Sequence, residues 1–179
     1  MIVSAYRLLE EIKLGRIIKN LDARELNSPE GVGFDLRIGT ISSISGMGAL
    51  GIETRRTGSA TPVATVNGNG NVYVRLEAGK TYLATTIEEF DLPEGLVGMF
   101  YPRSTLFRSG VVFQSSILPY GYCGPMTFAL TATNPEGFEL QLGARFAHVI
   151  LMEVSGPAGA YKGQWQGGRI AQPEDEEQI

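Results

Sequence analysis

The chain has 179 residues, of which 43% are apolar and 19% are charged, so it is long enough to bury one core of ordinary domain size. Its 19 acidic and 15 basic residues give a net charge of −4, and residues 174–177 supply four of the acids, so the rest of the chain is neutral. A neutral body excludes a general nucleic-acid binder, which needs clustered positive charge. The single cysteine excludes an internal disulfide framework and a cysteine-rich zinc site, and no zinc is expected.

No segment is suited to membrane insertion or secretion. The longest apolar run, near residues 146–152, contains His148 and has the length of a strand rather than of a membrane span. The first residues show no basic stretch followed by an apolar one. We therefore expect a cytoplasmic chain with no membrane partner.

The first expected element is a helix between Ser4 and Gly15. Ser4 is a candidate N-cap, and Gly15 is a candidate C-terminal stop. The apolar side chains between them recur at helical spacing and are Leu8, Leu9, Ile12 and Leu14.

After this helix the apolar period changes to two, which is typical of strands with one buried face. Strands are expected at residues 34–38, 72–77, 81–86, 96–101, 111–115, 126–133, 138–142 and 145–154. Turns containing glycine or proline separate them, and glycine makes up 23 of the 179 residues, well above its usual share of about 7%. Many short strands at this spacing predict an all-β sandwich or barrel.

Two segments depart from this pattern. Residues 42–70 are rich in Gly, Ser, Thr and Asn and alternate poorly, so they are expected to form a long excursion with one hairpin at residues 67–70. Residues 171–179 are acidic and are expected to be a disordered tail. Residues 1–170 are then expected to form a single domain.

The segment at residues 102–111 reads Pro-Arg-Ser-Thr-Leu-Phe-Arg-Ser-Gly-Val and has the most chemical content. The guanidinium groups of Arg103 and Arg108 could clamp phosphate oxygens by bidentate hydrogen bonds, and backbone N–H groups of the turn could add contacts to an anion. The alternative is a solvated turn that carries two surface arginines. Spacing alone does not decide between them.

This segment resembles the phosphate-binding motif of the superfamily that joins dUTP pyrophosphatases and dCTP deaminases. Residues 33–39, Gly-Phe-Asp-Leu-Arg-Ile-Gly, are similar to an early strand motif of both branches. The helix that ends in Gly15-Arg16-Ile17 and the position of Arg108 resemble the deaminase branch. Residues 162–168 are similar to the Lys-Tyr-Gln-Gly-Gln segment that closes over nucleotide in deaminases, except that Gly163 replaces the tyrosine. The order of these motifs and their separations along the chain also match the family, and the resemblance covers nearly the whole chain.

The resemblance implies a distorted β-barrel or jelly roll of the dUTPase type with an N-terminal helix, assembled as a homotrimer with its sites between subunits. It implies a pyrimidine deoxynucleoside triphosphate as ligand, with Mg²⁺ associated with the triphosphate. In the deaminases a glutamate activates water to attack C4 of cytosine without a metal. In the pyrophosphatases an aspartate activates water to attack phosphorus.

The same resemblance assigns substrate-binding residues to three places in this chain: the Arg-Ser segment, the hairpin that reads the base with the chain just before it, and the closing segment. These residues are Arg103, Ser104, Arg108, Ser115, Gly121, Tyr122, Lys162, Gln164 and Gln166.

Two positions depart from the family pattern. The deaminase glutamate falls on Ala129, and the pyrophosphatase aspartate falls on Pro119. Neither side chain can accept a proton, and losing a general base costs about 10²–10⁴ in rate. Glu136 and Glu139 are expected to lie roughly 15–20 Å away along the sheet. No catalytic residue is therefore assigned.

Two other polar residues are expected to be structural. Asp35 is expected to pair with Arg37 or with an arginine of another subunit. His148 lies in an apolar strand and is expected to be a satisfied core or interface residue. Trp165, in the closing segment, is expected either to stack on a base or to anchor the segment.

Three functions remain open. The first is a dCTP deaminase-like hydrolase that converts dCTP to dUTP, or dUTP to dUMP and pyrophosphate. The second is a catalytically inactive, nucleotide-binding or regulatory trimer of the same fold, and the third is a jelly-roll module for another small ligand. The sequence leaves open whether the chain is an enzyme.

Overall fold

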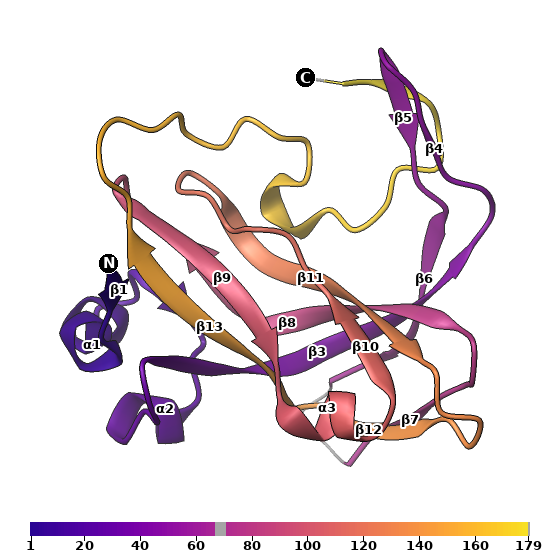
Figure 1. The fold of residues 1–179 in the computed structure, drawn as a ribbon, viewed down its shortest axis with the longest axis horizontal. Coiled ribbons are helices and arrows are strands. Elements are labelled where there is room, and N and C mark those ends of the chain that lie inside the picture. Colours follow the sequence, from indigo (N-terminus) through magenta and orange to yellow (C-terminus); the bar gives the residue numbers. More distant parts are fainter. Residues whose placement is uncertain (67–70, 179) are drawn as a thin grey trace.

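The computed structural model describes residues 1–66 and 71–178, which form a curled β-structure with helices at its edge (Figure 1). The helical elements are α1 (Ala5–Lys13), α2 (Ala23–Asn27), α3 (Ser104–Arg108) and the 3₁₀ turn η1 (Gln166–Gly168). The strands are β1 (Ile2–Val3), β2 (Ile17–Lys19), β3 (Gly33–Ser45), β4 (Ala49–Leu50), β5 (Thr54–Arg56), β6 (Ser59–Thr65), β7 (Tyr73–Leu76), β8 (Thr81–Asp91), β9 (Leu96–Pro102), β10 (Val111–Gln114), β11 (Cys123–Ala132), β12 (Phe138–Gln141), β13 (Arg145–Glu153) and β14 (Glu176–Glu177). Over the described residues, no helix has the length and apolarity that a membrane crossing requires.

Helix α1 forms where the apolar spacing predicts it. It follows Ser4, whose backbone is extended but whose side chain makes no capping hydrogen bond. Leu8, Leu9 and Ile12 are buried as expected. Leu14 is 68% exposed because the helix ends before it, and Gly15, at φ +74°, turns the chain away.

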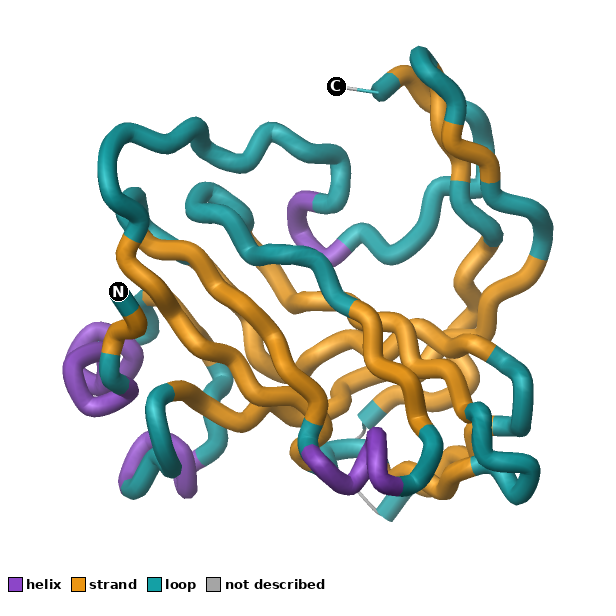
Figure 2. The backbone as a smooth tube through the Cα atoms, in the orientation of Figure 1, coloured by secondary structure: helices purple, strands orange, loops and turns teal. Residues whose placement is uncertain are grey.

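Nine strands form one antiparallel sheet that curls into a half-barrel (Figures 1 and 2). Its order is β1-β13-β3-β8-β11-β10, with β2 paired to β8, β6 to β3 and β9 to β13. All eight strands predicted from the period-two pattern are present. The prediction of an all-β, barrel-like fold with an N-terminal helix is thereby confirmed.

The inner face of this sheet is an aromatic and aliphatic core. Alternate residues of β8 and β11, such as Tyr82 and Phe128, are almost fully buried. The ring of Phe128 lies 4.9 Å from that of Phe100 and 5.5 Å from that of Phe146, measured between centroids and at steep angles. Edge-to-face pairs of this kind add roughly 0.5–1.5 kcal/mol to the free energy gained from burial.

The outer face of β8 and β11 is partly open and carries paired threonines on either side of Leu83 and Ala129. The hydroxyl of Thr81 lies 2.7 Å from that of Thr131, and the hydroxyl of Thr85 lies 3.2 Å from that of Thr127. Ala129 lies between these two pairs on the same face of β11, since side chains alternate along a strand. The position at which the family pattern has a glutamate therefore faces away from the core.

The excursion predicted at residues 42–70 is more regular than its composition suggests. β3 continues to Ser45, and β6 returns along it in antiparallel register from Ser45 opposite Ser59 to Thr40 opposite Thr65. The short strands β4 and β5 form an arm beyond that pair. The hairpin predicted at residues 67–70 lies outside the described residues.

The acidic segment (residues 174–177) lies against this arm. β14 pairs antiparallel with β5, so that β14, β5 and β4 form a small three-stranded sheet (Figure 1). The backbone N–H of Gln178 donates to the carbonyl of Glu53 at 2.8 Å. These contacts involve residues 176–178, and the disorder that the sequence predicts for residues 171–179 stays a prediction.

Candidate functional site

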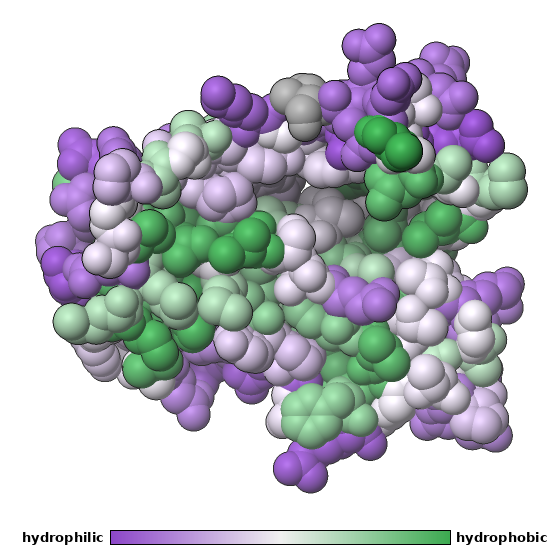
Figure 3. Space-filling model, turned by 45° about the horizontal axis from the view of Figure 1, so that its top comes forward, coloured by the Kyte–Doolittle hydropathy of each residue, from purple (hydrophilic) through white to green (hydrophobic). Residues whose placement is uncertain are grey.

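A cavity of about 910 Å³ opens on the outer face of the sheet. Ala129 lies in its floor, between Leu83 on β8 and Gln114 on β10, which are its partners in the strand register. The hairpin between β10 and β11, the β4–β5 arm and the closing segment form its walls. In Figure 3, hydrophobic residues gather around the hollow on this side of the molecule.

The closing segment is bonded to the hairpin of its own chain. The side-chain amide of Gln166 donates to the carbonyl of Gly121 at 2.6 Å, and its oxygen accepts from the backbone N–H of Cys123 at 2.8 Å. A β-carbon on Gly124, at φ +127°, would lie 2.9 Å from the backbone of Gly167. Glycine at this position is what lets the two backbones touch.

Tyr122 lines the cavity from the hairpin. Its side chain is buried, its hydroxyl donates to the carbonyl of Pro125, and its ring lies 5.5 Å from that of Tyr161. Burial raises the pKa of Tyr122 to about 12, because the phenolate would lose its hydration. The phenol is therefore neutral near pH 7 and serves as a wall rather than as a base.

Of the other residues that the resemblance assigns to this region, Ser115 lines the cavity. Gln164 donates to the carbonyl of Glu177 at 2.7 Å, so it contacts the acidic segment. Lys162 is exposed.

Three arginines border the cavity, and the sequence patterns do not single them out. This arginine rim consists of Arg55, Arg56 and Arg169. The guanidinium of Arg55 lies 4.7 Å from the ring centroid of Trp165, and that of Arg169 lies 5.7 Å from it. The available signal is the adjacent pair Arg55-Arg56 inside a segment with few other charges. The pair lies within residues 42–70, where the alternation of apolar and polar residues is too poor to predict its role.

The Arg-Ser segment lies apart from this cavity. Arg103, Ser104 and Arg108 are not among the lining residues. Ser104 and Arg108 are exposed on α3, where Arg108 lies 5.7 Å from the ring centroid of Phe107. In Figure 1, α3 lies at the lower edge, while β5 lies at the upper right and the short yellow coil of the closing segment lies above the sheet. Within one chain, the structure does not bring these residues to Ala129.

Arg103 instead belongs to an inner cluster (Asp35, Glu88, Arg37, Arg103 and Arg145). Asp35 has 4% side-chain exposure and accepts hydrogen bonds from Arg103 and from Arg145, the latter at 3.0 Å. The expected pairing of Asp35 with Arg37 is replaced, because Arg37 bonds to Glu88 at 2.8 Å. A second cavity of about 400 Å³ lies beside these arginines.

His148 completes this arrangement. Its Nδ1 lies 2.9 Å from the second oxygen of Asp35, and its side chain is 25% exposed. The prediction of a satisfied histidine is confirmed. Asp35 is thus contacted by three side chains of its own chain, which gives it the structural role that the sequence predicts.

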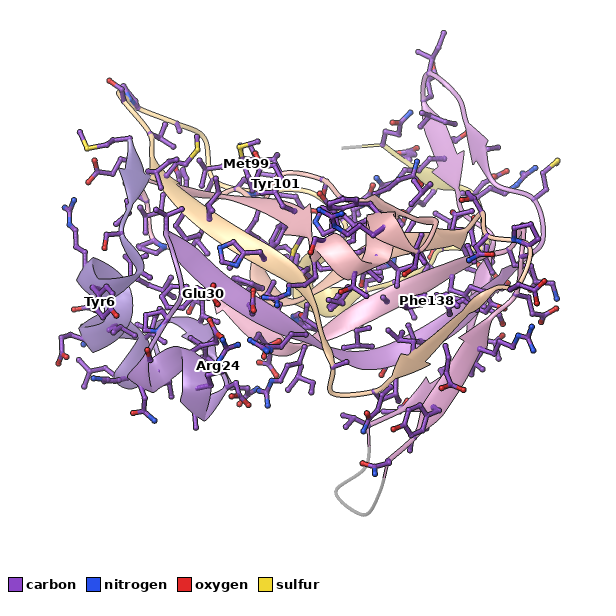
Figure 4. The ribbon with its side chains drawn as sticks, turned by 60° about the horizontal axis from the view of Figure 1, so that its bottom comes forward. Tyr6, Arg24, Glu30, Met99, Tyr101 and Phe138 are labelled. Atoms are coloured by element: carbon purple, nitrogen blue, oxygen red, sulfur yellow. The ribbon has the colours of Figure 1, made fainter. Side chains whose placement is uncertain are left out.

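Two buried glutamates accept hydrogen bonds from residues of the inner cluster. Glu25, on α2, accepts from the backbone N–H of Asp35 at 3.1 Å. Glu88, on β8, is fully buried and accepts from the backbone and the side chain of Arg37. Burial raises the pKa of both carboxyls, and the bonded N–H groups only partly offset that effect. Figure 4 shows this side of the molecule, with Arg24 and Glu30 near α2.

No proton acceptor of the usual kind lines the larger cavity. Within residues 1–66 and 71–178, no Asp, Glu, His or Cys side chain borders it. Glu136 and Glu139 lie elsewhere, on the turn before β12 and on β12 itself. The described lining residues of one chain can therefore offer a ligand hydroxyls, amides and guanidinium groups, and they include no carboxylate or imidazole.

The dCTP deaminase-like family matches residues 2–154 of this chain. A probable deoxyuridine 5'-triphosphate nucleotidohydrolase of Methanothermobacter thermautotrophicus is 32% identical over 153 residues, which cover 84% of this chain and 96% of that protein. A dCTP deaminase of Pyrobaculum neutrophilum is 29% identical over 174 residues, which cover 97% of this chain and 96% of that protein.

Among solved structures, the 2'-deoxycytidine 5'-triphosphate deaminase of Agrobacterium tumefaciens superposes with a TM-score of 0.63 at 15% identity. The match covers 84% of this chain, which spans 46% of that longer chain. The curled sheet with a cavity on its outer face therefore defines a dUTPase-like fold. The chain belongs to the dCTP deaminase-like family.

Proposed function

We propose that this chain binds a pyrimidine deoxynucleoside triphosphate, with the base in the cavity over Ala129. The observation that carries the proposal is the cavity itself, which measures about 910 Å³ and is closed on one side by a segment bonded to the hairpin. Its size is that of a site for a small organic ligand. Its lining supports binding rather than chemistry, because the described lining residues include no carboxylate or imidazole.

A second copy of the chain is part of this proposal. Arg103, Ser104 and Arg108 lie away from the cavity of their own chain, so they can reach a nucleotide only in a neighbouring copy. Exposed apolar side chains suited to an interface lie on β9 and α3, and Met99, Tyr101 and Phe107 are 36%, 48% and 58% exposed. Figure 4 shows Met99 and Tyr101 projecting from β9. We propose a homotrimer, which light scattering at several protein concentrations would test.

Mg²⁺ enters the proposal as the companion of the triphosphate. Among the described residues, no group of three or more Asp, Glu, His or Cys side chains could hold a metal ion. Phosphate oxygens and water, which are the usual ligands of Mg²⁺ beside one or two carboxylates, would then supply its coordination. The chain's own residues would bind the phosphates rather than the ion.

Conversion of the nucleotide is the second candidate. It is favoured by the relatives, whose names include both a dCTP deaminase and a deoxyuridine triphosphate nucleotidohydrolase at 96% coverage of each. A base from a neighbouring copy would be needed, since the cavity of one chain offers none among its described lining residues.

Calorimetry with dCTP and with dUTP, together with chromatography of the products in the presence of Mg²⁺, tests both candidates. The first predicts binding without a deaminated product or released pyrophosphate. Turnover by the unmodified chain would establish the second candidate. If neither nucleotide binds, both candidate functions are wrong.

Ala129→Glu sharpens this test. A carboxylate at this position faces the cavity, and a general base contributes about 10²–10⁴ in rate, so we expect deamination of dCTP to appear or to rise by about that factor. Ala129→Gln is the matched control, with similar size and no base, and it should stay inactive. If both variants bind dCTP and neither deaminates it, the cavity does not hold the cytosine ring next to residue 129.

A further inference from the structure

The arginine rim is occupied by carboxylates of the same chain. The carboxylate of Glu176 bridges two of the arginines, with Oε1 3.1 Å from Arg55 Nε and Oε2 2.9 Å from Arg169. The carboxylate of Asp175 lies 2.9 Å from Arg56. The acidic segment thus contacts all three rim arginines through two adjacent residues.

These pairs leave the rim incompletely satisfied. Three guanidinium groups face two carboxylates, which leaves one positive charge in excess. Arg55 Nη2 lies 3.1 Å from the same oxygen of Glu176 but lacks hydrogen-bond geometry, so this buried nitrogen has no hydrogen-bond partner among residues 1–66 and 71–178. A group with more acceptor oxygens than a carboxylate would satisfy the rim better, because each guanidinium presents five donors.

The rim also lies next to the apolar part of the cavity. Trp165, which Arg55 and Arg169 both approach, lines the same cavity as Ala129. A ligand that joins an aromatic ring to a chain of phosphates would therefore meet an apolar floor and three guanidinium groups in one chain. Arginine forks match phosphate oxygens in pairs, which favours phosphate over a single carboxylate.

We propose that Arg55, Arg56 and Arg169 form a binding site for the phosphate groups of the ligand, and that Asp175 and Glu176 occupy this site until the ligand displaces them. The acidic segment is then an internal competitor. The assignment of this site to the phosphates of the nucleotide rests on the proposed function. The anion site itself can be tested without any nucleotide.

The hold of the segment is suited to displacement. Asp175 and Arg56 are 59% and 30% exposed at the side chain, so water and salt compete with their pairing. The other anchors are mainly backbone hydrogen bonds to the arm, made by β14 with β5 and by the N–H of Gln178 with Glu53, and they must break when the segment leaves. A polyanion that binds the same three arginines would replace the ion pairs of Asp175 and Glu176, which compensates for their loss.

Sodium tripolyphosphate is the probe, and fluorescence of Trp165, the chain's one tryptophan, reports on the rim directly. Glu176→Gln removes one competitor charge, and we expect tripolyphosphate to bind about tenfold more tightly, within the usual range of coupling between two sites. Glu174→Gln is the matched control: it removes the same charge, and no ion pair of the Glu174 side chain is found among the described residues. Its affinity should equal that of the unmodified chain.

A measurement on the unmodified chain makes the test independent of any variant's folding. Saturating tripolyphosphate should speed amide hydrogen exchange of residues 175–178, because the N–H of Gln178 loses its bond to Glu53 when the segment leaves. Unchanged or slowed exchange, equal affinity in the Glu176→Gln and Glu174→Gln variants, or no binding of tripolyphosphate would each overturn the proposal.

Parallel titrations with dCTP and dUTP separate this proposal from the proposed function. If the nucleotide binds equally well to the Glu176→Gln and Glu174→Gln variants, the proposed function stands and the acidic segment is not an internal competitor. If tripolyphosphate releases the segment but the chain binds neither nucleotide, the arginine rim is an anion site and the proposed nucleotide ligand is wrong.

Discussion

The inner cluster and the arginine rim are built from the same kinds of side chain, arginines and carboxylates, but differ in how these are placed. Each sets three arginines against two carboxylates. In the inner cluster the carboxylates are almost fully buried, with Asp35 and Glu88 at 4% and 0% side-chain exposure. At the rim, Asp175 and Glu176 are 59% and 16% exposed. Both carboxylates of the inner cluster are buried, whereas Asp175 at the rim is open to water, and we expect this difference to make the rim pairs the more easily displaced.

The energetics of the two regions follow from this difference. Removing one partner of a buried pair leaves an uncompensated charge and costs about 3–5 kcal/mol. An exposed pair is worth about 0–1 kcal/mol, because water and salt ions replace the lost partner. We therefore expect substitutions in the inner cluster to change the stability of the fold, and substitutions at the rim to change binding.

The largest effect is expected for Glu88→Ala. This change removes the acceptor of two hydrogen bonds from Arg37, each 2.8 Å long, and leaves that guanidinium next to the core with Asp22 as its remaining carboxylate partner. We expect a loss of about 3 kcal/mol in the free energy of unfolding, measured by urea denaturation. Glu89→Ala, at the exposed next position, is the control and should stay within about 0.5 kcal/mol of the parent. Equal effects of both changes would remove the distinction between the two regions.

A smaller effect is expected in the pH dependence of stability. Burial raises the pKa of Glu25 above its usual 4.5. A carboxyl whose folded pKa is raised contributes stability that is present below the unfolded pKa and is lost as the pH rises through the folded pKa. The free energy of unfolding should therefore lose this contribution between pH 4.5 and the raised value.

Glu25→Gln tests this pH dependence, since the amide oxygen can still accept from the N–H of Asp35 and cannot titrate. Urea denaturation from pH 4.5 to neutrality should give a shallower decline than in the parent chain. Glu30→Gln, on an exposed residue, should leave the slope unchanged. A steeper decline in the Glu25→Gln variant would mean that the folded pKa of Glu25 is lowered rather than raised.

The smallest effect is expected from salt. Raising NaCl from about 0.05 M to about 1 M shortens the Debye length from roughly 14 Å to 3 Å and screens exposed pairs most. The rim pairs should weaken by less than about 1 kcal/mol, which is enough to change the fluorescence of Trp165. Circular dichroism should stay constant, because the carboxylates of the inner cluster are almost fully buried. A spectrum of Trp165 that is insensitive to salt would show that the rim is as fixed as the inner cluster.

The sequence predicts the elements that depend on local alternation. The strands appear because side chains alternate between core and outer face, and α1 appears because its apolar residues share one side. The pattern predicts that β8 ends at Thr86, whereas the strand continues to Asp91, since the buried Glu88 interrupts the apolar alternation. The burial of Glu88 depends on Arg37, 51 positions away, and no local pattern reports such a partner.

The candidate site divides in the same way. The resemblance assigns Gly121 and Gln166 to it, and the structure joins these two residues by a hydrogen bond. The rim could not be predicted, because Arg55 and Glu176 are 121 positions apart and each looks like an ordinary surface charge. The contribution of Arg103, Ser104 and Arg108 stays a prediction, since it requires a second copy.

The hairpin and the closing segment are in backbone contact at Gly124 and Gly167. Two chain segments meet there with no side chain between them, and a methyl group at position 124 would collide with backbone rather than with a side chain that can rotate away. One added carbon would therefore wedge the segment off the hairpin. The closing segment can lie against the hairpin, beside the proposed nucleotide site, because position 124 carries no β-carbon.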